Sequence, residues 1–85
     1  MDIIKMGKYS ALESNLKRRY DGMTSIINEI NSIIPIVEDS CKTDGDNAYV
    51  NELRSIRDDI ISKRDKIYNV IIPELEREIE QAGQS

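Results

Sequence analysis

Apolar residues recur along the first half of the chain at alternating steps of four and three residues. This spacing keeps them on one stripe of an α-helix, and an unbroken run of it is typical of left-handed supercoiled helices. The pattern predicts a first helix over about residues 8–39, with an apolar seam along one side. The predicted seam consists of Leu16, Tyr20, Met23, Ile27, Ile30, Ile34 and Val37.

Three further isoleucines, Ile26, Ile33 and Ile36, lie beside this seam. They widen the apolar stripe toward the end of the helix, beyond what contact with a single neighbouring helix requires. We therefore expect the first helix to have more than one helical neighbour.

The stretch from Asp39 to Asn47 has no large apolar residue and is rich in residues that leave helices and form turns. It predicts a turn at about residues 40–46, with positive φ at Gly45 and an incidental thiol at Cys41. A connection this short returns the second half of the chain antiparallel to the first. The predicted fold class is all-α, an antiparallel two-helix hairpin in a single domain over residues 1–85.

The second half predicts a helix over about residues 47–82, with Asp46 or Asn47 as its N-cap. Its seam contains one basic layer, at Lys63 or Arg64, whose long aliphatic stem can cover apolar surface. The other predicted members of this seam are Tyr49, Leu53, Ile56, Ile60, Ile67, Ile71, Leu75 and Ile79.

Capping and proline residues refine the helix boundaries. Ser10 and Glu13 have the spacing of a capping box, which places the start of the first helix between Gly7 and Ser10. Pro35 and Pro73 each fall late in a predicted helix and remove one backbone donor. Because apolar residues continue beyond both prolines, we expect each to kink its helix rather than to end it.

Composition narrows the possible functions of this 85-residue chain. It has no histidine, so the commonest general base and metal ligand is missing, and its single cysteine allows neither an intramolecular disulfide nor a thiolate metal cage. A formal net charge of -4 and a basic run limited to residues 17–19 argue against binding to nucleic acid. We predict no catalytic residue, no cofactor and no metal site, and the protein is expected not to be an enzyme.

The apolar runs are too short for a membrane-spanning helix or a cleaved signal peptide. We expect a cytoplasmic protein without an integral membrane segment, and any export of it would use a route without a cleaved signal. The glutamates near the end of the second helix oppose the helix dipole, which indicates basic partners such as Lys5 and Lys8 from the facing helix.

A hairpin of this size is close to marginal, since the burial of its apolar surface barely offsets the entropy lost on ordering. We therefore expect it to pair with another helical protein, either a second copy or a different chain, in a four-helix bundle. The predicted partner interface consists of Leu16, Tyr20, Met23, Ile26, Ile27, Ile30, Ile33, Ile34, Ile56, Ile60, Ile67 and Ile71.

The segment around the turn, Lys42-Thr43-Asp44-Gly45-Asp46-Asn47-Ala48-Tyr49-Val50-Asn51-Glu52-Leu53, resembles the hairpin turn of the WXG-type small proteins of bacterial type VII secretion. The turn motif is marked by Thr43, at the position of the family's Trp, and by Gly45. The opening Ile4-Lys5-Met6, with Tyr9 and Leu12, is similar to the usual start of these proteins and of the partners of LXG toxins. The resemblance extends over nearly the whole chain.

The resemblance implies a partner or targeting chaperone that docks on a helical segment of an LXG-type toxin and contributes to the surface recognised for secretion. The family's export motif, Tyr-Xaa-Xaa-Xaa-Asp/Glu, is not met at Tyr68, which has Ile72 at the acidic position. This difference favours a partner over a free-standing substrate. The alternative is a homodimeric coiled-coil hairpin that acts as an adaptor or structural protein in the cytoplasm, for example a phage-encoded one.

Overall fold

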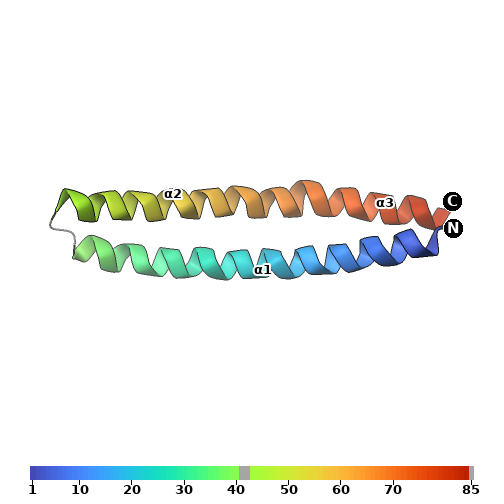
Figure 1. The fold of residues 1–85 in the computed structure, drawn as a ribbon, viewed down its shortest axis with the longest axis horizontal. Coiled ribbons are helices and arrows are strands. Elements are labelled where there is room, and N and C mark those ends of the chain that lie inside the picture. Colours follow the sequence, from blue (N-terminus) through green and yellow to red (C-terminus); the bar gives the residue numbers. More distant parts are fainter. Residues whose placement is uncertain (41–42, 85) are drawn as a thin grey trace.

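The computed structural model describes residues 1–40 and 43–84 as a hairpin of two helical rods that lie side by side (Figure 1). The Cα atoms extend 63 Å along the longest axis and only 15 and 13 Å across it. The two termini lie together at one end, where the Asp2 N–H donates to the Ala82 carbonyl at 2.9 Å. The predicted all-α antiparallel hairpin is confirmed. Cys41 lies outside the described residues.

Helix α1 (Ile3–Asp39) forms the first rod. The second rod consists of α2 (Asp44–Lys66), the π-helix η1 (Ile67–Ile71) and α3 (Ile72–Gln84), which follow one another without an intervening loop. The turn between the rods is therefore shorter than the residues 40–46 expected for it.

The first rod begins earlier than expected, because Asp2 caps it. The Asp2 carboxylate accepts the Lys5 N–H at 3.0 Å, which satisfies one of the free donors of the first turn. Ser10 and Glu13 lie inside the helix, so the prediction that they form a capping box is wrong. A motif with capping spacing is redundant where a better cap precedes it.

The second rod also begins earlier than expected, and the turn prediction for Gly45 is wrong. Thr43 is the N-cap, with extended backbone (φ −135°) and a hydroxyl that accepts the Asp46 N–H at 3.2 Å. Gly45 lies in the first turn of α2, and none of residues 1–40 and 43–84 has positive φ. Asp44 and Asp46 suit this position because carboxylates interact favourably with the helix N-terminus. The cap predicted at Asp46 or Asn47 is corrected accordingly.

The seam predicted for α1 packs against the second rod as expected. Its members are buried or half-buried, with Ile27, Ile30 and Ile34 only 4%, 8% and 6% exposed. Ile30 and Ile34 form the core cluster together with Val50 of α2. The partly buried residues packed against this cluster are Val37, Leu53 and Ile60.

The seam predicted for the second rod is wrong at three residues. Tyr49, Ile56 and Ile71 are 50%, 46% and 38% exposed, whereas Val50 and Ile72, one position later, are each 3% exposed. The prediction followed the large apolar side chains, but the packing follows an unbroken alternation of three-residue and four-residue steps through α2. The observed seam of α2 and the start of η1 is Val50, Leu53, Arg57, Ile60, Arg64 and Ile67.

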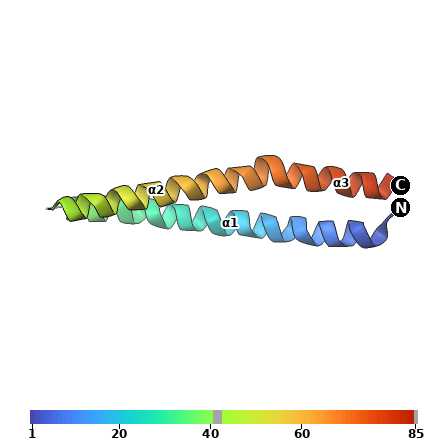
Figure 2. The same cartoon turned by 45° about the horizontal axis from the view of Figure 1, so that its top comes forward.

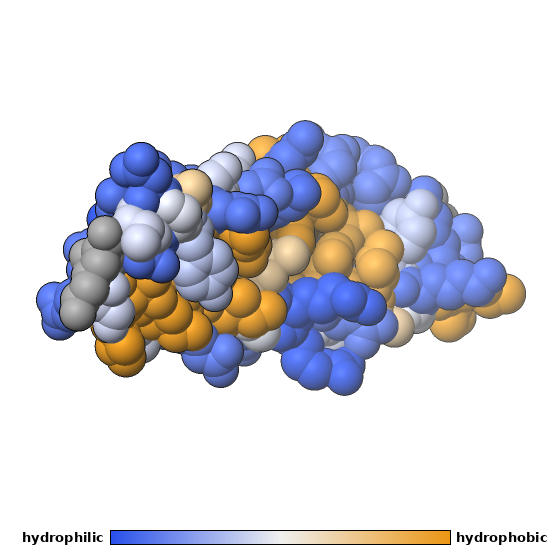
Figure 3. Space-filling view, turned by 60° about the vertical axis from the view of Figure 1, so that its left-hand side comes forward, coloured by the Kyte–Doolittle hydropathy of each residue, from blue (hydrophilic) through white to orange (hydrophobic). Residues whose placement is uncertain are grey.

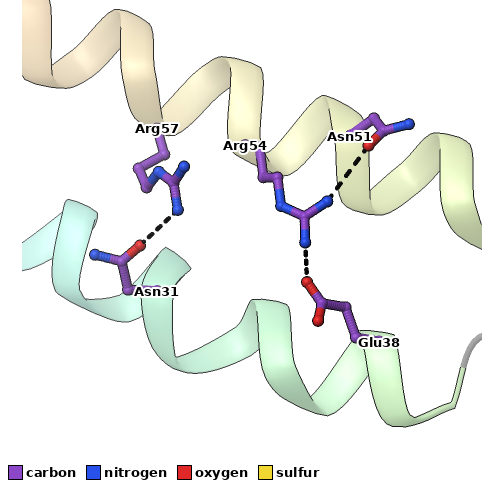
Figure 4. Close-up of polar contacts among 5 residues, drawn as sticks. All are labelled: Asn31, Glu38, Asn51, Arg54 and Arg57. Carbon is purple, nitrogen blue, oxygen red and sulfur yellow. Dashed lines mark hydrogen bonds and ion pairs between the residues drawn. The ribbon is translucent and has the colours of Figure 1, made fainter.

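Two arginines form polar layers in this seam. Arg57 donates to the Asn31 side chain at 3.0 Å (Figure 4). Arg64 donates to the Thr24 hydroxyl at 3.3 Å, and its guanidinium lies 5.4 Å from the centre of the Tyr20 ring. Arg64 therefore provides the expected basic layer. A long arginine side chain can occupy the seam because its stem packs while its head group bonds at the edge.

The π-helix keeps the apolar residues of α3 in the seam. Regular α-helical spacing from Ile67 would bring Ile71, Glu74 and Glu78 to the seam. The π turn adds one residue, with the Ile72 N–H donating to the Ile67 carbonyl. The seam residues of α3 become Ile72, Leu75, Ile79 and Ala82, all buried or half-buried. One extra residue in a turn thus replaces two glutamates by apolar side chains.

Neither proline ends its helix. α1 continues through Pro35 without a π turn. Pro73 is the second residue of α3, just after η1, where the second rod changes direction in Figure 2. Because Pro35 is accommodated within a continuous α-helix, a proline is not sufficient to produce a π turn. What distinguishes the two sites is the apolar pattern. Around Pro35 it keeps regular α-helical spacing, whereas after Ile67 it shifts by one residue.

We therefore predict that deleting one residue of η1 is tolerated. In a chain without Asn69, regular α-helical steps lead from Ile67 to Ile72, Leu75 and the rest of the seam, so the π turn is not needed. Stability should change by no more than about 1 kcal/mol. Ser25 of α1 is also exposed and polar, but α1 has no π turn that could absorb its deletion. Deleting Ser25 therefore rotates the rest of the α1 seam away from the second rod. The free energy of unfolding should fall by several kcal/mol, about as much as for a core truncation. Urea unfolding followed by circular dichroism measures both, and equal destabilisation by the two deletions contradicts this explanation of η1.

The position of Gly45 leads to a second prediction. A Cβ at this position meets only the Thr43 hydroxyl, at 3.7 Å, an ordinary contact. Gly45→Ala should stabilise the protein by about 0.5 kcal/mol, because alanine loses less backbone entropy on entering a helix. Thr43→Ala should destabilise it by about 1 kcal/mol, because the cap is lost. Thermal unfolding of both variants checks the pair, and destabilisation by Gly45→Ala argues for a turn conformation there instead.

Candidate interaction surface

The rods meet along two edges, and one of them is crossed by polar contacts. Glu38 pairs with Arg54, and Lys17 lies 3.9 Å from Glu76 (the first pair is shown in Figure 4). Each of these residues directly follows a seam residue in the sequence. We call this side of the hairpin the polar edge. Its charges are largely satisfied within the chain.

The opposite edge carries residues that directly precede a seam residue. Its contact near the termini is Lys5 with Glu78, 3.2 Å apart, where the hydrogen bond to Glu78 and the charge of that carboxylate raise the pKa of Lys5. Nearer the turn the same edge is apolar and exposed. The residues there are Ile26 and Ile33 of α1, and Tyr49 and Ile56 of α2.

This apolar edge belongs to a second stripe, again with steps of three and four residues, that is exposed on both rods. We call it the second face. Its members are Leu12, Asn15, Arg19, Gly22, Ile26, Glu29, Ile33 and Ile36 of α1, Tyr49, Glu52, Ile56, Asp59, Lys63 and Lys66 of α2, and Val70 of η1. Ile36 is the most exposed apolar residue of this set, at 67%. In Figure 3, viewed toward the turn, apolar side chains reach the surface near the turn and along the hairpin, between polar ones.

The predicted partner interface divides into two groups. One group is already covered by the hairpin itself and lies in the seam between the rods: Leu16, Tyr20, Met23, Ile27, Ile30, Ile34, Ile60 and Ile67. The other group is exposed: Ile26, Ile33, Ile56 and Ile71. The first three of these lie on the second face. The other apolar residues of that face are Tyr49 and Ile36 near the turn, and Leu12 and Val70 nearer the termini. Two spacings in the sequence could have indicated the first pair: Tyr49 lies one heptad before Ile56, and Ile36 lies three residues after Ile33.

The glutamates of α3 do not converge on a common site. Glu78 is paired with Lys5 as predicted, while Glu76 is reached by Lys17 rather than by Lys8. Over residues 1–40 and 43–84, no group of three or more acidic or cysteine side chains is arranged to hold a metal ion. Glu74, Glu76 and Glu78 make ion pairs instead, with Arg77, Lys17 and Lys5 in that order.

No helix in the described part of the chain is both long and apolar enough to cross a membrane. Comparisons with protein-family models, curated proteins and solved structures find no match to this chain. Exposed apolar surface on a small protein is a feature of interaction sites in general, so the second face is the candidate surface.

Proposed function

We propose that this protein is a non-enzymatic interaction module that binds a helical partner along the second face. Within that class, we propose that it is a partner or targeting chaperone of a type VII-secreted LXG-type toxin. The observation that carries the first proposal is the exposed apolar stripe centred on Ile33, beside a seam that the hairpin has already closed.

The small size of the hairpin core supports this proposal. In the described part of the chain, the buried apolar residues are limited to Ile27, Ile30, Ile34, Val50, Ile72 and Ala82. A partner that covers the second face would add a set of isoleucines of comparable size. Each buried methylene contributes about 0.8 kcal/mol, so this addition is large for so thin a core. Packing of two further helices on such a stripe gives a four-helix bundle, with side chains interdigitating as they do in the first seam.

The more specific role rests on the sequence resemblance described above. The residues that resemble the hairpin turn of WXG-type proteins include Thr43 and Gly45, and those that resemble the start of such proteins include Lys5 and Tyr9. A helical hairpin with an unfilled apolar face suits the task of covering an apolar helix of a larger exported protein. A gene for an LXG-type toxin beside the gene for this protein would support this role.

The proposal predicts that a charge on the second face abolishes partner binding without unfolding the hairpin. Ile33→Asp places a carboxylate where partner side chains would bury it without a counter-ion, which costs several kcal/mol. We expect at least about a 100-fold loss of affinity for the helical N-terminal segment of the cognate toxin. Co-purification of tagged protein from its native host identifies the partner, and titration with that segment measures the loss.

Ser32→Asp is the matched control, because it introduces the same charge at the adjacent residue, on the outer side of α1. It should bind as the wild type does, and circular dichroism should show both variants equally helical. An export assay in a strain that lacks the protein then tests the secretion role. If no helical protein co-purifies and every type VII substrate is still exported, the secretion role is wrong. Equal binding by both variants would exclude the second face as the binding surface.

A further inference from the structure

The charges of the second face change sign along the hairpin. On the side of Ile26 nearer the turn lie three carboxylates: Glu29, Glu52 and Asp59. On the side nearer the termini lie three cations: Arg19, Lys63 and Lys66. Lys63 contacts Asp59 one helical turn away, at 3.0 Å, and no other ion pair within the described residues involves these six side chains. The face is therefore neutral as a whole but strongly polarised along its length.

The height of each residue along the hairpin follows from contacts between the rods. The contacts of Arg57 with Asn31, Arg64 with Thr24, and Tyr68 with Tyr20 set the register of the two rods. Glu29 and Asp59 then lie at one height. Lys66 and Gly22 lie at another, on the other side of Ile26.

We infer that the second face binds a second copy of this chain, antiparallel to the first, about a two-fold axis that crosses the face near Ile26. This inference rests on the proposed function only in taking the second face as the binding surface. A two-fold axis makes an interface complementary to itself, so each patch must match the patch at the same distance on the other side of the axis. The sign change at Ile26 meets this requirement for charge.

An antiparallel two-fold operation of this kind places α1 on α1 of the second copy and the second rod on the second rod. Ile26 then faces its own counterpart at the axis. Gly22 has nothing within 4 Å of where a Cβ would be, so it leaves room for a close approach near the centre of the contact.

The area is sufficient for a stable dimer. With the axis near Ile26, the turn limits the overlap to about 13 residues on each side, or about 40 Å of helix at 1.5 Å per residue. Two helices side by side are about 20 Å wide, so the footprint is about 800 Å² on each copy. This is the size of a standard specific interface.

A second copy carries the complementary charge pattern already, whereas any other helical partner of this face would need a matching pattern of its own. The acidic half of the second face lies nearer the turn and the basic half nearer the termini. In a parallel pair of chains, each half would therefore face a half of the same charge. Like charges that face each other across an interface strongly weaken association. The pattern therefore also selects the antiparallel arrangement.

Charge reversal tests the inference directly on the full chain. The first variant replaces the three carboxylates: Glu29→Lys, Glu52→Lys and Asp59→Lys. The second replaces the three cations: Arg19→Glu, Lys63→Glu and Lys66→Glu. A control variant has the same charge change as the first but lies away from the face: Asp21→Lys, Asp39→Lys and Glu80→Lys. Sedimentation velocity over about two decades of concentration from about 1 μM measures association of the 9.7 kDa chain.

The wild type and the control should sediment as dimers at the upper concentrations. Each face variant alone should dissociate at least about 100-fold more readily, because its face then carries one sign of charge. An equimolar mixture of the two face variants should recover the dimer to within about tenfold of the wild type, because a wholly basic face then meets a wholly acidic one. Circular dichroism of the mixture and of each variant reports whether the helices persist.

A wild type that is monomeric throughout overturns the inference, and so does a dimer that survives in both face variants. Failure of the mixture to recover the dimer overturns it as well, whether or not the separate variants fold. These outcomes are distinct from failure of the proposed function. A monomeric wild type that still captures a helical toxin segment refutes only the second copy. A dimer that behaves as described, with no helical partner in the native host, refutes only the toxin role.

Discussion

The hairpin depends on keeping one apolar stripe of each rod in phase with the other over more than ten helical turns. Side chains at alternating three-residue and four-residue steps can stay in contact over this length only if the helical repeat follows the sequence repeat. In α1 it does so throughout. In the second rod the sequence repeat jumps by one residue after Ile67, and the helix follows with a π turn. The π turn is thus a consequence of the core, since without it Glu74 and Glu78 would face α1.

Sequence reasoning predicts the hairpin and the seam of α1, because a regular repeat of isoleucines is compatible with only one buried stripe on a helix. It predicts the second seam at Leu53, Ile60 and Ile67 but misplaces it at Tyr49 and Ile56, because it favoured these large apolar side chains over Val50 and Arg57. It also assumes a constant helical repeat, which hides the π turn. The early cap at Thr43 is missed because several neighbouring residues cap almost equally well, and only the geometry of the chain selects among them.

The same geometry explains why one edge of the hairpin stays exposed near the turn. Residues that follow seam positions make ion pairs across the polar edge, as Glu38 does with Arg54, and need nothing further. The residues that precede seam positions in the turn half are mostly isoleucines and a tyrosine, with Glu29, Glu52 and Asp59 between them, and none of them makes an ion pair across the rods among the described residues. The second face was predictable as an excess of apolar residues on α1. Its extension to Tyr49 and Ile56 was not, because that extension requires the correct phase of the second rod.

Neighbouring isoleucines of α1 belong to two different surfaces: Ile30 and Ile34 to the closed seam, and Ile33 and Ile36 to the exposed second face. Methyl NMR of the isoleucines with a soluble paramagnetic probe measures this directly. In dilute protein, the probe should strongly broaden the methyl signals of Ile33 and Ile36 but not those of Ile30 and Ile34. Addition of the binding partner, or a rise in protein concentration, should then protect only the first pair. Equal broadening of all four signals, or protection that never appears, would contradict the account.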